Sequence, residues 1–384
     1  MTPTQSTLAQ QIAERLLERN RVFEDFFVHQ APRLAAISRE MAERFLRGGR
    51  LLAFGRGACA TDAQHVSVEF VHPVIVGKRA LPALDLSAEF ALWLEALVHP
   101  EDIVMGFAPP EGDIEVQAAL VTARARKAMT LSFPAVTNDA FIHQEAIEIL
   151  YHTLWETVHV FLEHRELGQD TGPAGFLYPF LGQNKHDAAS LEKEVAESIL
   201  MKVRDDARLR AQVAEEQSEQ IAATAVAIEQ RIRRGGKLIL FGNGGSATDA
   251  NDWALDCIAP PHGWRPVPAI SLSMEPANIS AIANDVGTEV VFLRQLIAHA
   301  RPEDVAVGIS TSGGSRNIVA ALEEARKRGL LTVALLGYDG GEVLRRGVAD
   351  LPLIVRCDYI PRIQEVQASI YHTLRAAHEG AACA

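Results

Sequence analysis

Short apolar runs alternate with longer amphipathic stretches in the second half of the chain. The runs are rich in β-branched residues, and stretches with helical spacing, such as 315–328, separate them. Continuous apolar strands with helices between them are typical of a parallel sheet that is covered on both faces. The pattern therefore predicts an α/β fold with strands at Lys237–Phe241, Ala269–Leu272, Val305–Ile309, Leu331–Leu336 and Leu351–Val355.

Long amphipathic stretches precede the sheet regions. Residues 33–47 and 217–234 have helical periodicity, and each stretch runs into a Gly-Gly pair, at 48–49 and 235–236. Over 190–232 the pattern predicts two long helices that lead into the second sheet.

The sequence contains an internal repeat. LLAFGRGACATDAQH at 51–65 aligns without a gap with LILFGNGGSATDAND at 238–252, and the later QE and YHTL motifs at 144–154 recur at 364–374. The offset between the copies grows from 187 to 220 residues, so the first copy lacks the counterparts of a segment around 283–287 and of a strand around 338–355. Because a repeat of this length indicates repeated structure, we expect two similar domains of unequal completeness. Their expected bounds are 1–165 and 189–384, with a Gly- and Pro-rich linker at 166–188.

Composition and charge exclude several classes of protein. The chain has 384 residues, 48% of them hydrophobic, which excludes bulk disorder and low-complexity classes. Its net charge of −12 and lack of a basic tract argue against a nucleic-acid partner. The four cysteines are scattered, the N-terminus lacks the pattern of a signal peptide, and no apolar run is long enough to span a bilayer. We expect a cytoplasmic protein with no membrane partner.

Two loops of the second copy have the composition of phosphate-binding loops. GNGGSATD at 242–249 and STSGGS at 310–315 each follow a strand and precede a helix. Glycines let the backbone approach an anion, and a helix N-terminus offers unpaired N–H groups. One such loop is equally well a turn with N-cap residues, whereas two at the ends of strands of one parallel sheet favour a ligand site. The predicted phosphate ligands are Asn243, Gly244, Ser246, Ser310, Thr311, Ser312 and Ser315.

These motifs, together with Asn-Asp-x-Gly at 284–287 and Arg-Ile-Gln-Glu at 362–365, resemble those of the sugar isomerase (SIS) domains. More narrowly, the chain resembles the phosphoheptose isomerases, over most of 190–378 and less completely over 20–163. The resemblance implies two flavodoxin-like SIS domains in tandem, each an α/β/α sandwich around a parallel sheet, with long N-terminal helices. It also implies isomerisation of a phosphorylated sugar of the heptose 7-phosphate class, without a nucleotide cofactor. The family tetramer would correspond to a homodimer of this tandem chain.

The resemblance further implies a metal and acid–base set made of a His and a Glu after the first loop and a Gln and a His on the last helix. The first copy has all four, and the second copy has two aspartates in place of the first pair. The corresponding residues are His65, Glu69, Gln144 and His152 in the first copy, and Asp252, Asp256, Gln364 and His372 in the second.

The spacing of these residues suggests how they assemble. His65 and Glu69 are an i, i+4 pair, which suits two ligands of one divalent ion such as Zn²⁺, although a simple polar contact is the alternative. Gln144 and His152 are eight residues apart, so their Cα atoms lie about 12 Å apart on a straight helix. We therefore expect the ligand set to be drawn from two copies, with His65 and Glu69 within reach of Gln364 or His372, above Ser310–Ser315.

The losses in the two copies are complementary. The first copy has Arg56 and Cys59 in place of Asn243 and Ser246, and its counterpart of the STSGGS loop is APPEGD at 108–113, whose carboxylates repel phosphate. The second copy keeps the loops but has altered metal ligands. We therefore expect a site shared between the unlike domains.

In that site Glu69 is the expected base, and His372 or His152 is the expected acid. Asp285 is the expected ligand of a substrate hydroxyl, with a turn residue as the alternative. Two functions fit the sequence. One is a sugar-phosphate isomerase, favoured by the retained His65 and Glu69. The other is a catalytically inactive sugar-phosphate-binding regulatory or assembly protein, favoured by the eroded first copy and by the shorter Asp256, since a base displaced by about 1 Å costs on the order of 10²-fold in rate.

Overall fold

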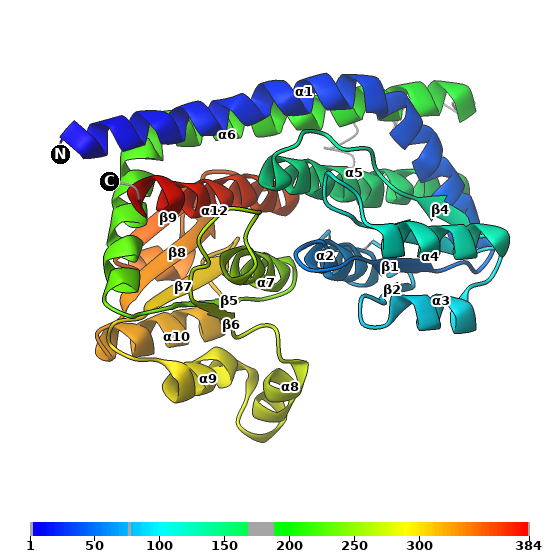
Figure 1. Cartoon of the computed structure of the whole chain (residues 1–384). Coiled ribbons are helices and arrows are strands. Elements are labelled where there is room, and N and C mark those ends of the chain that lie inside the picture. The colour runs from blue at the N-terminus through cyan, green and yellow to red at the C-terminus, as the bar shows by residue number, and fades with distance from the viewer. Residues whose placement is uncertain (1–2, 76–77, 168–187, 383–384) are drawn as a thin grey trace. The chain divides into compact units, whose positions relative to one another are not determined.

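The structure, a computed structural model, describes residues 3–75, 78–167 and 188–382 (Figure 1). The chain divides into two compact units, each with its own parallel sheet. We call Arg21–Asp205 the first-repeat unit, and Met1–Asn20 together with Asp206–Ala384 the second-repeat unit.

The second-repeat unit contains a parallel sheet of five strands in the order β6-β5-β7-β8-β9. Its strands are β5 (Leu238–Gly242), β6 (Ala269–Ser271), β7 (Val305–Ser310), β8 (Leu331–Gly337) and β9 (Leu351–Val355). The five predicted strands are confirmed to within one residue at each end. Every residue of β5 and β7 is buried, because apolar side chains leave both faces of these central strands.

Helices cover both faces of this sheet, as the α/β/α prediction requires. One face packs against α7 (Gly245–Ile258), α12 (Ile360–Ala382) and the second part of α6 (Ala188–Arg233). The other face packs against α9 (Val291–His299) and α10 (Arg316–Lys327), which Figure 1 labels, and against the short helix α11 (Gly341–Arg345). The helix α8 (Pro276–Asp285) has no buried residue, and the short 3-10 helix Thr288–Val290 connects it to α9.

The first-repeat unit has a shorter version of the same arrangement. Its described strands form a parallel sheet in the order β2-β1-β3-β4. Their bounds are β1 (Leu51–Phe54), β2 (Ala83–Asp85), β3 (Ile103–Gly106) and β4 (Met129–Leu131), and the helices are α2 (Cys59–Val71), α3 (Phe90–Leu97), α4 (Ile114–Ala125) and α5 (Ala140–Leu167). Within the described residues this sheet has no counterpart of β9, and α3 alone connects β2 to β3, in agreement with the predicted deletions.

Equivalent glycines have equivalent surroundings in the two units. A Cβ atom on Gly49 would lie 2.1 Å from the carbonyl oxygen of Glu101, and one on Gly236 would lie 2.2 Å from that of Glu303. The backbone at each of these glycines thus lies directly against the loop before the neighbouring strand, with no room for a side chain. The two copies therefore share backbone geometry as well as sequence.

The two longest helices differ from the sequence prediction. The stretch predicted as two helices over 190–232 is one continuous helix, α6, of 46 residues, since no glycine or proline interrupts it. The helix α1 (Pro3–Leu46) is also continuous, through Pro32. A helix of 46 residues is about 69 Å long, which allows it to contribute to more than one core.

Both long helices are divided between the compact units. Leu16 of α1 packs in the core of the second-repeat unit, whereas Phe27 of the same helix packs in the core of the first. In α6, Val195 belongs to the core of the first-repeat unit and Ile221 to that of the second. The compact units therefore differ from the predicted domains 1–165 and 189–384. Residues 1–20 belong to the second-repeat unit, and the part of α6 up to Asp205 belongs to the first-repeat unit. Most of the predicted linker (168–187) lies outside the described residues.

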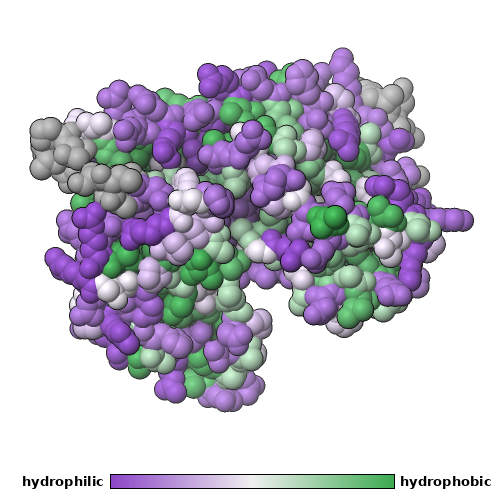
Figure 2. Space-filling view, in the orientation of Figure 1, coloured by the Kyte–Doolittle hydropathy of each residue, from purple (hydrophilic) through white to green (hydrophobic). Residues whose placement is uncertain are grey.

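The helices that the structure describes include none that is long and apolar enough to cross a membrane. Figure 2 shows mostly hydrophilic side chains on the visible side of α1. Cys59, Cys257 and Cys357, the cysteines within the described residues, are free thiols.

Candidate functional site

The two hydroxyl-rich loops meet at the topological switch point of the second-repeat sheet. From β5 the chain goes to β6 on one side of β5, and it then returns to β7 on the other side. The loops after β5 and β7 therefore lie at the carboxyl ends of two neighbouring strands, where open parallel sheets bind ligands.

The first of these loops is fixed by backbone contacts. A Cβ atom on Gly242 would lie 2.1 Å from the carbonyl oxygen of Ser246, so only glycine allows this turn. Gly244 has a φ of 57° and directly precedes α7. The Ser273 hydroxyl accepts a hydrogen bond from the Gly242 N–H (3.2 Å) and donates one to the Gly242 carbonyl oxygen (3.0 Å). These contacts place Ser246, which is buried, in the first turn of α7.

The second loop is held by its own hydroxyls. Oγ of Ser310 accepts a hydrogen bond from the Gly313 N–H (3.1 Å) and lies 3.4 Å from Oγ of Ser315. Oγ of Ser312 accepts one from the Gly314 N–H (3.2 Å). Ser315 directly precedes α10, but its side chain makes no cap hydrogen bond to that helix. Ser310, Ser312 and Ser315 thus lie in one loop directly before α10, and their role as phosphate ligands stays a prediction.

Asn243 has a partner that the sequence did not reveal. Its Nδ2 donates to Oδ1 of Asn317 (3.0 Å), and Nδ2 of Asn317 donates to Oδ1 of Asn243 (2.9 Å). Asn317 lies in the first turn of α10, so this amide pair connects the two loops. Sequence reasoning missed Asn317 because it lies beyond the Ser-Gly motif.

In the equivalent loop of the first repeat, the side chain of Asp113 takes the place at the helix N-terminus that an anion could fill. Oδ1 of Asp113 accepts hydrogen bonds from the backbone N–H groups of Glu115 (2.8 Å) and Val116 (3.1 Å), at the start of α4. Arg56 forms ion pairs with Asp113 (3.4 Å) and Glu115 (2.9 Å). The helix N-terminus is therefore capped by an anion of the chain itself, which supports the prediction that this loop does not hold a phosphate.

A buried cluster of potential metal ligands lies between α2 and α5 in the first-repeat unit. Nε2 of His65 lies 3.3 Å from Nε2 of His152 and 3.9 Å from Oε1 of Glu69. One ligand atom from each of the three residues lies within 4.8 Å of the other two, and the residues are at most 2% exposed. Three of the four predicted first-copy ligands are thus brought together.

The properties of Glu69 fit a bound cation. Its Oε2 atom is buried without a hydrogen-bond partner. Burial, with a smaller contribution from the charge of Glu156, raises the pKa of Glu69 to about 8. A buried carboxylate costs free energy unless a positive charge compensates it. Two imidazoles and one carboxylate are also a donor set that Zn²⁺ and similar ions prefer.

Gln144, the fourth predicted ligand of the first copy, contacts the start of α2. Its Nε2 donates long hydrogen bonds to the Ala58 carbonyl oxygen (3.4 Å) and to Oδ2 of Asp62 (3.4 Å). This position agrees with the separation of Gln144 and His152 along one helix. The structure therefore assembles three ligands from a single copy, whereas the predicted contribution of Gln364 or His372 to them stays a prediction.

The second repeat has a different cluster at the equivalent positions, between α7 and α12. Nε2 of His372 lies 3.1 Å from Oδ2 of Asp256 and 3.4 Å from Oδ2 of Asp252. The Tyr371 hydroxyl donates a hydrogen bond of 2.7 Å to Oδ2 of Asp252. Burial and the adjacent Asp252 carboxylate raise the pKa of Asp256, whereas His372 lowers it. The cluster contains donors for its carboxylates, so its need for a cation is smaller than that of Glu69.

Comparisons with known proteins agree with this geometry. A family profile described as "SIS domain" matches residues 203–337, which include both loops. The phosphoheptose isomerase of Geobacter sp. (strain M21) is 44% identical over 160 residues, which cover 41% of this chain and 82% of that protein. That of Chlorobaculum parvum is 43% identical over 182 residues, or 46% of this chain and 86% of that protein. The chain belongs to the phosphoheptose isomerase family.

The fold comparison extends the likeness beyond the matched half. The C-terminal domain of glucosamine-fructose-6-phosphate aminotransferase from Francisella tularensis covers 95% of this chain and 94% of its own length, with a TM-score of 0.59 and 10% identity. This likeness concerns the fold alone. It includes both parallel-sheet units, whereas the two phosphoheptose isomerases named above match 41% and 46% of the chain.

Asp285 and Gln364 are the two remaining residues that the family resemblance pointed to. Asp285 lies at the exposed end of α8, where its Oδ1 accepts a hydrogen bond from Asn284 (2.8 Å). Gln364 is buried on α12, eight residues before His372. The predicted roles of Asp285 as a ligand of a substrate hydroxyl and of Gln364 as a metal ligand stay predictions.

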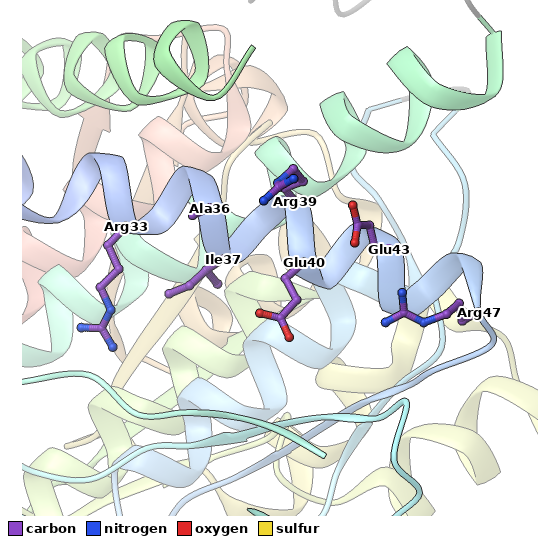
Figure 3. Close-up of a pocket in the computed structure, with 7 residues that line it drawn as sticks. All are labelled: Arg33, Ala36, Ile37, Arg39, Glu40, Glu43 and Arg47. Carbon is purple, nitrogen blue, oxygen red and sulfur yellow. The ribbon is translucent and has the colours of Figure 1, made fainter. Parts of the chain in front are cut away.

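A separate surface hollow of about 470 Å³ lies along α1, outside the family motifs (Figure 3). Its lining comes from α1 and the residue after it, and Arg39 and Arg47 are ion-paired with Glu192 and Glu101 at 2.6 Å. The lining residues are Arg33, Ala36, Ile37, Arg39, Glu40, Glu43 and Arg47. Because Arg39 and Arg47 are exposed and already paired with carboxylates, the hollow is a weaker candidate for a ligand site than the buried clusters.

Proposed function

We propose that this protein is a sugar-phosphate isomerase whose substrate is a heptose 7-phosphate. The observation that carries the proposal is the meeting of two glycine- and hydroxyl-rich loops at the switch point between β5 and β7. The names of the relatives supply the substrate class, since both are phosphoheptose isomerases.

The phosphate is bound by the second-repeat unit. Ser246, Ser310, Thr311, Ser312 and Ser315 provide hydroxyl donors, and the glycines let backbone N–H groups approach the phosphate oxygens. Each charge-assisted hydrogen bond contributes about 1.5–3 kcal/mol. The first-repeat loop has no such role, because Asp113 occupies its helix N-terminus.

A divalent cation is held by His65, Glu69 and His152. Support comes from the donor set and from the buried Oε2 of Glu69, which has no hydrogen-bond partner. A cation such as Zn²⁺ would supply positive charge to polarise the substrate carbonyl. In the second repeat, Asp252 and Asp256 already have Tyr371 and His372 as hydrogen-bond partners. We therefore assign the cation to the cluster of the first repeat.

The reaction moves a proton between adjacent carbons of the sugar through an enediol. Glu69 is the base that takes this proton and returns it to the neighbouring carbon. In the cation-free chain, burial raises the pKa of Glu69 to about 8. A bound cation lowers the pKa of a carboxylate that it contacts, so Glu69 is ionised and able to take the proton in the metal-loaded protein. His372, which lies outside the assigned cation site, protonates the carbonyl oxygen and takes the proton from the neighbouring hydroxyl as the second carbonyl forms. Asp285 binds a substrate hydroxyl.

The two repeats contribute different halves of this chemistry, and the working form is a homodimer. Support for the division is the content of each unit, since one unit has the anion loops and the other has the imidazole–carboxylate cluster. Support for the dimer is the expected correspondence with a family assembly of four SIS domains. Light scattering should give twice the chain mass of 41.8 kDa, and a monomer at micromolar concentration would contradict the dimer.

Isomerisation in D₂O tests the function. Sedoheptulose 7-phosphate should be converted to an aldoheptose 7-phosphate, with solvent deuterium appearing at the carbon that receives the proton. A chelator should stop the conversion, and added divalent metal should restore it. Conversion that is unaffected by thorough metal removal would refute the cation assignment while leaving the isomerase in place.

The second candidate function is a catalytically inactive sugar-phosphate-binding protein. It is favoured by the contacts of Asp252 and Asp256 with Tyr371 and His372, which form a self-contained hydrogen-bonded set in the repeat that has the phosphate loops. Tight binding of sedoheptulose 7-phosphate without product or deuterium exchange, in metal-loaded protein, would establish this alternative.

A further inference from the structure

A reciprocal amide pair connects the two halves of the phosphate cradle. Asn243 lies in the glycine loop after β5, and Asn317 lies in the first turn of α10 after β7. Two hydrogen bonds of 3.0 and 2.9 Å join their carboxamides. Oδ1 of Asn317 also accepts the backbone N–H of Ile318 (3.0 Å), which fixes the orientation of this amide. We call this pair the cross-loop pair.

The first repeat has a cross-loop pair at the equivalent positions, built from different chemistry. Asp113 aligns with Ser315, so Glu115 aligns with Asn317, and Arg56 aligns with Asn243. Nη1 of Arg56 lies 2.9 Å from Oε1 of Glu115. A connection between these two loops is therefore present in both repeats, although both residues differ. This observation is independent of the amide contacts and points to a role in spacing the loops.

The chemistry of each pair matches the loop that it borders. In the first repeat, Arg56 also faces the carboxylate of Asp113, and an ion pair is compatible with a loop that binds no anion. In the second repeat, a glutamate at position 317 would place a negative charge in the first turn of α10, beside the serine hydroxyls. A neutral amide pair makes the same connection without repelling a phosphate.

We propose that Asn317 is a positioning residue for the phosphate, and that it acts through Asn243. The cross-loop pair holds the Ser246 loop and the Ser310–Ser315 loop at the spacing that one phosphate group requires. This inference rests on the proposed phosphate-binding function. It changes the role of Asn243 from a direct phosphate ligand, as the sequence suggested, to the partner of Asn317.

A double-mutant cycle tests the proposal. Asn243→Ala, Asn317→Ala and the double variant are compared with the wild type, by calorimetric titration with sedoheptulose 7-phosphate and with inorganic phosphate. Each single variant should lose about tenfold in affinity, and the double variant should lose no more than either single one, because residues that act only through one another are not additive. Losses that multiply to about 100-fold would show that Asn243 contacts the phosphate independently, and would overturn the proposal.

Two further variants separate positioning from general damage. Transplanting the first-repeat pair, as Asn243→Arg with Asn317→Glu, should recover affinity relative to Asn317→Asp, which adds a charge without a partner. The matched control is Arg56→Ala with Glu115→Ala, which removes the pair of the first repeat and should leave phosphate affinity unchanged. Equal affinity of the transplant and Asn317→Asp would contradict a spacing role.

Hydrogen exchange of the ligand-free protein distinguishes failure of this inference from failure of the proposed function. In Asn317→Ala, the backbone amides of 243–246 and 310–315 should exchange faster than in the wild type, whether or not the protein binds phosphate. A wild type that binds no phosphate, together with faster exchange in the variant, would refute the proposed function and the phosphate role but retain the cross-loop contact. Unchanged exchange would refute the contact itself.

Discussion

Nε2 of His65 lies 3.3 Å from Nε2 of His152, in a cluster that is closed to solvent. Two ring nitrogens at this distance form a hydrogen bond only when one of them carries a proton, and two protonated rings would repel each other. A divalent cation beside Glu69 would give both nitrogens the same favourable partner. The cluster therefore has the properties of a ligand set more than those of a packing contact.

The first prediction concerns metal content. His152→Ala should remove the bound divalent metal, because it deletes one of three ligands. His372→Ala is the matched control at the equivalent position of α12 and should retain the metal. The test is elemental analysis after dialysis against a trace of Zn²⁺. Loss of metal in His372→Ala and retention in His152→Ala would reverse the assignment of the repeats.

The second prediction concerns pH in the presence of a chelator. The folded chain keeps the proton of Glu69 up to a pKa of about 8, whereas the unfolded chain loses it near the ordinary value of 4.5. Because the folded state binds more protons in this window, this group makes the free energy of unfolding decrease as the pH rises from 4.5 to 8. Glu69→Gln removes the contribution, so its Tm relative to the wild type should increase across this range and level off above it.

Thermal unfolding of both proteins between pH 5 and pH 9 checks this result, and these pH values bracket the pKa of about 8. Other buried carboxyls with raised pKa values, such as Asp256, are common to both proteins and cancel in the difference. A difference in Tm that does not change with pH would show that Glu69 is not protonated in the cation-free fold.

The third prediction concerns phosphate affinity. Replacing Ser312 and Ser315 with alanine should weaken sedoheptulose 7-phosphate binding by a few kcal/mol, at about 1.5–3 kcal/mol for each charge-assisted hydrogen bond lost. Glu111→Ala, in the equivalent loop of the first repeat, serves as the control and should leave binding unchanged. Calorimetric affinities that do not differ between the double serine variant and the wild type would refute the phosphate site.

The fourth prediction compares the two helix N-termini. Asp113 caps α4 through two backbone hydrogen bonds, so Asp113→Ala should lower the free energy of unfolding by about 1 kcal/mol. Ser315→Ala, at the equivalent position before α10, should change stability by much less, because the Ser315 side chain makes no cap hydrogen bond. Denaturant unfolding measures both. Equal destabilisation by the two substitutions would indicate that Ser315 caps its helix and has no surplus donor for a ligand.

Some features of this fold could be predicted from local sequence, and others could not. The strands were predictable because β5 and β7 are continuous apolar runs, and the loops because Gly242 and Gly313 allow turns that a Cβ atom would block. The exchange of helix segments was not predictable, since periodicity shows that α6 has an apolar face but not which core buries each part of it. The candidate site was also only partly predictable.

The ligand residues of the site were found through their motifs, whereas their partners were not. Tyr371 was visible only as part of a repeated YHTL motif, and its hydrogen bond to Asp252 spans 119 residues. Asn317 pairs with Asn243 across 74 residues. The complementary charges of Arg56 and Glu115 at the same positions of the first repeat were the one signal that could have indicated this contact.

We propose that the second-repeat unit binds the phosphate and that the first-repeat unit supplies the base. The most direct test is the rate of aldoheptose 7-phosphate formation by two metal-loaded variants. We predict that Glu69→Gln lowers kcat on the order of 10²-fold or more with little change in KM, because it removes the base and one ligand of the cation but no phosphate contact. Ser312→Ala with Ser315→Ala should instead raise KM strongly, because it removes phosphate contacts. A Glu69→Gln variant with the kcat of the wild type would contradict the role of Glu69 as the base. A wild type that binds sedoheptulose 7-phosphate without converting it would contradict the isomerase function.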